Sequence, residues 1–234
     1  MIPRSVPLYS LAWAAALLPF IATHVSYLLA ASLGHVEWCV PYWDSCTSIS
    51  ATGRLMPEKL WFRVSMIPAA LVTLLFWWQS ARWRRDAGPC QFPLSLKLMP
   101  WLGSIAAICL ILYTLALGEE GETSRFIRRS GVVVAFAFTY LAQLLLTRQL
   151  GDLARVRQSR SLQRWHDALF VLSMALLAIG MLSVVLDAWL GSGYDRYEDA
   201  FEWNLALLLN LYFAGFALCS RQTCQEAGIK NPAN

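Results

Sequence analysis

The sequence predicts an all-α polytopic membrane protein, a bundle of six transmembrane helices in which residues 1–234 form one domain. Hydrophobic residues make up 57% of the chain and charged residues only 15%, whereas soluble domains average about 45–50% and about 25%. The apolar stretches recur along the whole chain, so the surplus apolar surface needs lipid as its solvent. Each stretch also reaches the roughly 20 residues that a helix needs to cross a hydrocarbon core.

Short polar spacers separate these apolar stretches. Backbone groups in lipid must find hydrogen bonds within their own segment, so helices are the expected structure. A transmembrane β-barrel would instead show alternating segments of about ten residues. In chain order, we expect the spans at residues 7–32, 59–80, 98–118, 128–148, 167–190 and 200–220.

Basic residues in alternate loops indicate how the spans are oriented. Arg4 precedes the first span, Arg82–Arg85 follow the second, and Arg155–Arg164 lie between the fourth and fifth. Arg125, at the outer end of the fourth span, weakens this asymmetry without reversing it. We therefore expect both termini in the cytoplasm. The membrane would be the inner (plasma) membrane of a bacterium, or an endomembrane or plasma membrane in another organism.

Two cysteines, Cys39 and Cys46, share the first outer loop, with six residues between them. Disulfides persist in the compartment that this loop would face. A bridge would close a small ring ahead of the second span, and the alternative is two unpaired thiols. No Cys/His spacing in the chain resembles a metal site, and we expect no metal, no cofactor and no nucleic-acid partner.

Ionisable side chains within spans are costly and often functional. In one interpretation each of them snorkels to the interface or pairs locally. In the other they line a polar cavity open to the outer leaflet, where Arg63 and Arg128 meet a lipid phosphate. A neighbouring carboxylate would then hold His24 ready to act as a base, which makes it the one catalytic candidate. The residues of this kind, all in the outer half of the spans, are His24, Arg63, Arg128, Asp187 and Glu202.

The segment that enters the second span reads S-I-S-A-T-G-R-L-M-P-E-K-L-W-F over residues 48–62. Pro57 and Glu58 suit the first turn of a helix. A helix start does not explain the polar residues and the glycine that precede them. The residues of this segment that we take as candidates for a site are Ser48, Ser50, Thr52, Gly53 and Glu58.

This segment resembles the I-S-x-T-G-x-x-x-P-E-x-x-x-F pattern of the DRAM/Frag/Sfk family of six-helix membrane proteins. Glu202-Trp203, at the start of the last span, is a second match. Family members often carry a His near the outer start of the fourth helix, where this chain has Arg128 and Arg129. The resemblance implies lipid handling at a membrane. The family includes autophagy modulators, a factor for lipid remodelling of GPI anchors, and organisers of phosphoinositide kinase complexes, without one common reaction.

The sequence thus predicts a multi-pass protein that binds or helps remodel membrane lipid through a polar site open to the outer or lumenal leaflet. One alternative is a membrane lipid acyl- or phospholipid-transferase that uses His24 or an outer carboxylate. The missing family-like His counts against it. Another is a non-catalytic scaffold that recruits a protein partner to the cytoplasmic face through its basic loops. The simpler interpretation of those loops is that their charges fix the topology.

Overall fold

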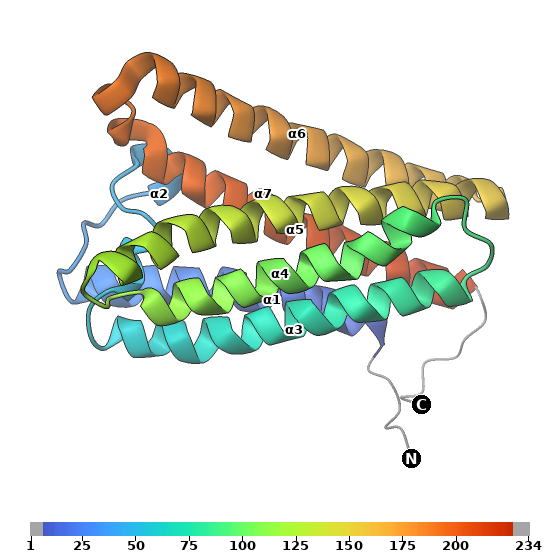
Figure 1. Ribbon diagram of the computed structural model, residues 1–234, viewed down its shortest axis with the longest axis horizontal. Helices are drawn as coiled ribbons and strands as arrows, with labels where there is room; N and C mark the ends of the chain where they lie inside the picture. The colour runs from blue at the N-terminus through green and yellow to red at the C-terminus, as the bar shows by residue number, and fades with distance from the viewer. Residues whose placement is uncertain (1–6, 227–234) are drawn as a thin grey trace.

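Six long helices dominate the structure, a computed structural model that describes the chain from residue 7 to residue 226. By length and apolar composition each of the six can cross a membrane, and the described residues form no strand. The all-α, six-helix prediction is therefore confirmed. The long helices, drawn in Figure 1, are α1 (Leu8–Ser32), α3 (Glu58–Asp86), α4 (Pro93–Ala116), α5 (Glu122–Arg157), α6 (Arg160–Leu190) and α7 (Asp195–Glu226).

Most of these helices run past the apolar spans expected from the sequence. Helix α5 has 36 residues, which is about 54 Å at 1.5 Å per residue, whereas its apolar stretch covers 128–148. Backbone hydrogen bonding continues through the polar residues at both ends. Helix α4 is displaced instead: it begins at Pro93, which is accepted in the first turn of a helix, and it ends at Ala116.

The two ends of the bundle differ. One end, here called the loop end, carries the connection 33–57 with the short helices α2 (Pro41–Asp44) and η1 (Ala51–Gly53). It also carries the turn 117–121 and η2 (Gly191–Gly193). The other end, here called the terminal end, holds the start of α1, the end of α7 and the connections 87–92 and 158–159. In Figure 1 the loop end lies at the left.

Helix α6 lies at the edge of the bundle. Helices α1, α3, α4 and α5 pack in sequence, α7 packs on α1, and α6 packs on α5 and α7. The last buried residue of α6 is Leu176, just past the midpoint of the helix. Figure 1 shows α6 leaning away from α5 toward the loop end. Toward that end α6 separates from α5, whereas its Gly180 still lies beside Leu205 of α7.

Aromatic side chains fill the core toward the terminal end. Trp77 is completely buried, and its ring packs edge-on against Phe76 and Phe213 at centroid distances of 5.0 and 5.6 Å. Gly103 on α4 makes this possible, because a Cβ there would lie 2.1 Å from Trp77 Cδ1. The indole therefore occupies the space that a side chain at residue 103 would need.

A buried ion pair ties α3 to α5 at the terminal end. Arg84 Nη2 lies 2.5 Å from Asp152 Oδ2, and both side chains are 0% exposed. The guanidinium also donates to the carbonyls of Gly88, Pro89 and Gln149. Arg84 belongs to the run of arginines expected to mark topology, but in the structure it holds the 87–92 connection against α5.

Candidate functional site

The family-like segment folds inward and closes the loop end of the bundle. Thr52 is completely buried and Ile49 is 5% exposed. Ser26 on α1 donates to the Thr52 carbonyl at 2.7 Å, and the Thr52 hydroxyl donates to the Ile49 carbonyl at 2.8 Å. Thr52 thus satisfies the backbone of a tight turn and is not open to the membrane or to water.

Gly53 is fixed by close packing. A Cβ on Gly53 would lie 2.9 Å from both Leu117 Cδ2 and Phe62 Cγ. This position brings η1 directly onto α3 and the end of α4. The spacing of the glycine and the phenylalanine in the motif therefore follows from their contact.

The serines of the segment lie nearer the surface than Thr52. The Ser48 and Ser50 hydroxyls are 3.1 Å apart, and Arg54 Nη2 donates to Ser50 Oγ at 2.9 Å. Arg54 is exposed and both serines are partly accessible. These three side chains are the part of the segment that a ligand at the loop end can reach.

Glu58, by contrast, is enclosed. Its side chain is completely buried, and Oε1 is hydrogen-bonded to Nδ1 of His35. The second oxygen, Oε2, has no hydrogen-bond partner among the described residues. His35, just beyond α1, was not identified from the sequence because it lies outside every apolar span.

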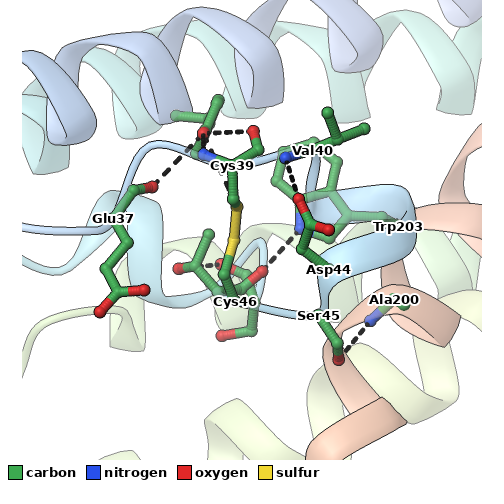
Figure 2. The surroundings of a disulfide bond; sticks show 11 residues. Glu37, Cys39, Val40, Asp44, Ser45, Cys46, Ala200 and Trp203 are labelled. Carbon is green, nitrogen blue, oxygen red and sulfur yellow. Dashed lines mark hydrogen bonds between the residues drawn. A yellow bond between two sulfur atoms is a disulfide. The ribbon is translucent and has the colours of Figure 1, made fainter.

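The loop that holds the two cysteines bridges α1 and α7. Figure 2 shows Cys39 and Cys46 joined in a disulfide bond, with the Val40 amide donating to Asp44 Oδ2 at 2.7 Å. The Ala200 amide, near the start of α7, donates to Ser45 Oγ at 3.1 Å.

Further contacts fasten this loop on both sides. Trp203 Nε1 on α7 donates to the Thr47 carbonyl at 2.8 Å. Tyr27 on α1 donates to the Cys39 carbonyl at 2.7 Å. The disulfide loop, residues 39–46, therefore fixes the spacing of α1 and α7 at the loop end.

His24 is held by a carbonyl and a phenol rather than by the carboxylate expected from the sequence. Nδ1 lies 2.7 Å from the Phe20 carbonyl, which only accepts, so Nδ1 carries the hydrogen. Nε2 lies 2.9 Å from the Tyr42 hydroxyl. Burial raises the pKa of Tyr42, which keeps the phenol protonated and donating to Nε2.

Arg63 contacts the end of α4. Its Nη2 donates to the carbonyls of Leu115 and Leu117 at 2.7 and 3.1 Å, and to Glu119 Oε1 at 2.6 Å. Cations are favoured at the carbonyl end of a helix. Arg63 is therefore not part of a shared site with His24 or Glu202. Asp187 is not part of one either, because its side chain is exposed near the end of α6.

A cavity of about 90 Å³ lies inside the bundle. Its wall is mostly apolar, and at the loop end it includes Glu202 and Tyr113. Within the described part of the chain, no group of His, Cys, Asp or Glu side chains is placed to hold a metal ion. The apolar wall comes from α1, α3, α4, α5 and α7 and includes Pro19, Phe62, Leu110, Phe136, Leu209 and Phe213.

Of the charged residues expected from the sequence, Glu202 lines the cavity and Arg128 does not, and both act electrostatically on Tyr113. The Ile49 amide hydrogen-bonds to the Glu202 carboxylate. Sequence reasoning missed Arg54 and Tyr113. Arg54 stands at an unspecified position of the motif, and a tyrosine in an apolar stretch looks like an ordinary core residue.

The wall between α5 and α7 is held only near the terminal end of the cavity. Gln143 Nε2 donates to the Leu209 carbonyl at 3.1 Å, and the Tyr212 hydroxyl donates to the Gln143 carbonyl at 2.8 Å. From Gln143 toward the loop end, no hydrogen bond joins the described parts of these two helices. On this stretch packing alone holds the two helices together, and α6 has separated from α5.

Comparison with known proteins identifies the family. A family model described as the Frag1/DRAM/Sfk1/Cwh43P N-terminal domain matches residues 7–218, from the start of α1 to near the end of α7. No curated protein and no solved structure matches the chain. The resemblance noted in the motif of residues 48–62 is confirmed by this match. With its six membrane-spanning helices, the chain belongs to the Frag1/DRAM/Sfk1/Cwh43P family of integral membrane proteins.

Proposed function

We propose that this protein binds a membrane lipid, with an acyl chain in the cavity between α5 and α7 and the head group at the loop end. The observation that carries the proposal is the cavity itself, which is apolar along most of its length and bears Glu202 and Tyr113 near the loop end. Binding sites are typically apolar clefts in which a few polar groups fix the orientation of the ligand.

The cavity has the length of part of an acyl chain, but its volume of about 90 Å³ is smaller than such a chain, so α5 and α7 must move apart to admit one. Glu202 and Phe213, which both line it, are 11 residues apart on α7, or about 16 Å along a helix. A slender apolar ligand with one polar end matches this shape. The unbonded stretch of the α5–α7 wall would let the ligand enter sideways from the bilayer.

We further propose that the loop end faces the outside of the cell or a lumen, with both termini in the cytoplasm. The basic loops at the terminal end support this orientation. The Cys39–Cys46 disulfide supports it as well, because disulfides persist in oxidising compartments. The head-group site then opens to the outer or lumenal leaflet of an inner, plasma or internal membrane.

Binding is better supported than lipid transfer or scaffolding. The imidazole of His24 is engaged by the Phe20 carbonyl and Tyr42, and His24 does not line the cavity. No observation therefore favours a general base acting on a lipid there. Among the basic residues proposed to recruit a cytoplasmic partner, Arg84 is buried in an ion pair.

Filling the cavity tests the proposal. Ala206 on α7 lines it, so Ala206→Phe should occupy the space of the acyl chain. Leu211→Phe is the matched control, because Leu211 lies on the same helix and is 46% exposed. We expect native mass spectrometry to find lipid bound to the wild type and to Leu211→Phe, and most of it lost from Ala206→Phe. Equal lipid retention by a well-folded Ala206→Phe variant would overturn the proposal.

A further inference from the structure

The Tyr113 side chain carries a buried polar atom that is left without a partner. The residue is 2% exposed, and its hydroxyl forms no hydrogen bond with any described residue. The ring is fixed edge-on against Phe62, and Gly131 lets α5 approach closely, since a Cβ there would lie 3.3 Å from Tyr113 Cβ. Buried hydroxyls are costly without a hydrogen bond. Because Tyr113 lines the cavity, a ligand oxygen can supply the missing partner.

Two arginines act electrostatically on this hydroxyl, although neither is among the described residues that line the cavity. Arg54, which follows η1, and Arg128 on α5 both act electrostatically on Tyr113 and on each other. Arg54 donates to Ser50 Oγ, and Arg128 has no ion pair or hydrogen bond within residues 7–222. Two guanidinium groups that repel each other are stabilised by an anion between them, and guanidinium geometry suits phosphate.

Among the described residues that line the cavity, Glu202 supplies the carboxylate. Glu202 acts electrostatically on Tyr113, and Asp199 and Glu198 act on Glu202. In the described structure, none of these three carboxylates lies in an ion pair with Lys or Arg. A head group carrying only a phosphate would meet this negative charge. A head group that also carries a cation complements both sets of residues.

The kind of cation follows from the donors it offers. A primary ammonium donates three hydrogen bonds, which suits the Glu202 carboxylate. A quaternary ammonium donates none and is usually held in an aromatic cage.

We propose that the loop end of the cavity recognises a phosphoethanolamine head group. Its phosphate lies between Arg54 and Arg128 and accepts a hydrogen bond from the Tyr113 hydroxyl, and its ammonium contacts Glu202. This inference rests on the proposed lipid binding and names the class of lipid that the same cavity takes.

A competition between head groups tests this assignment. Purified protein is mixed with equal amounts of phosphatidylethanolamine, phosphatidylcholine and phosphatidylglycerol with identical acyl chains, and bound lipid is counted by native mass spectrometry. We expect the wild type to favour phosphatidylethanolamine by about tenfold, equivalent to about 1.4 kcal/mol. Glu202→Gln should lose the preference over phosphatidylglycerol, because the carboxylate that repels the anionic lipid is gone.

Two further variants separate head-group contacts from structural effects. Tyr113→Phe removes only the unpartnered hydroxyl, so we expect thermal stability without lipid to be equal to or higher than that of the wild type, and retention of all three phospholipids to be weaker. Arg128→Gln should also weaken retention of all three phospholipids. Arg129→Gln, at an exposed site on the same helix, should leave retention unchanged.

The outcomes distinguish this inference from the proposed function. Lipid that is bound without a head-group preference would overturn the phosphoethanolamine assignment and leave lipid binding standing. A preference that survives unchanged in Glu202→Gln would overturn the role given to that carboxylate. No bound lipid in any sample would overturn both proposals.

Discussion

Buried charge at single residues determines much of how this protein holds together. Asp152 is enclosed with Arg84, and its Oδ2 also accepts from the Gln91 amide at 3.1 Å. The other oxygen, Oδ1, has no partner among the described residues. When one partner of a fully buried ion pair is removed, water does not reach the charge that remains, and that charge is left without compensation.

Asp152→Asn should therefore be strongly destabilising. The amide keeps the shape of the side chain but leaves the Arg84 guanidinium buried without a counter-charge, at a cost of roughly 3–5 kcal/mol. The measurement is the unfolding midpoint of the purified protein in detergent, followed by tryptophan fluorescence. Asp167→Asn is the control, because that carboxylate is 61% exposed. An unchanged midpoint for Asp152→Asn would contradict the importance given to the pair.

At the scale of elements, side chains from one helix fasten the ends of its neighbours. Arg63 and Lys59, both on α3, hold the turn between α4 and α5 through Glu119. The Lys59 ammonium also donates to the Gly118 carbonyl at 3.0 Å. The start of α3 therefore positions the turn that leads into α5, the helix that carries Arg128.

This contact should depend on pH. The hydrogen bonds from Arg63 and then Lys59 lower the pKa of Glu119 below its ordinary value of 4.5. A carboxylate with a lowered pKa stabilises the fold above its ordinary pKa, and the effect is lost as pH falls through the folded-state value. Glu119→Gln should slightly lower the melting temperature at neutral pH, and its difference from wild type should shrink as pH falls below 4.5 and vanish below the lowered pKa.

Thermal melts of wild type, Glu119→Gln and Glu120→Gln across this pH range check the prediction. Glu120 is exposed, adjacent and without an ion pair in the described structure, so its variant should follow the wild type at every pH. A deficit of Glu119→Gln that persisted in acid would show that the loss does not come from the carboxylate charge.

For the whole molecule, the helices were predictable because apolar length is a local property of the sequence. The ends of the helices were less so, since α5 continues well past its apolar stretch in both directions. Glu202 and Arg128 could be proposed from the sequence because charge within a span is conspicuous, and their role in a site stays a prediction. The sequence could not show that Arg63 and Asp187 lie away from the cavity. Only the packing of the folded helices places Arg63 against the α4 carbonyls and Asp187 on the outside. Tyr113 could not be identified from the sequence, because its hydroxyl is buried without a hydrogen-bond partner only in the folded bundle.

The central claim is that a lipid acyl chain occupies the cavity between α5 and α7, and photolabelling in bilayers tests it most directly. The probe is a phosphatidylethanolamine with a diazirine in its acyl chain, and peptide mass spectrometry locates the adducts. We predict adducts on cavity residues such as Ala135 and Ala206, and their loss in Ala206→Phe. Adducts confined to bilayer-facing residues such as Val184 and Val185, with the cavity unlabelled, would contradict the claim.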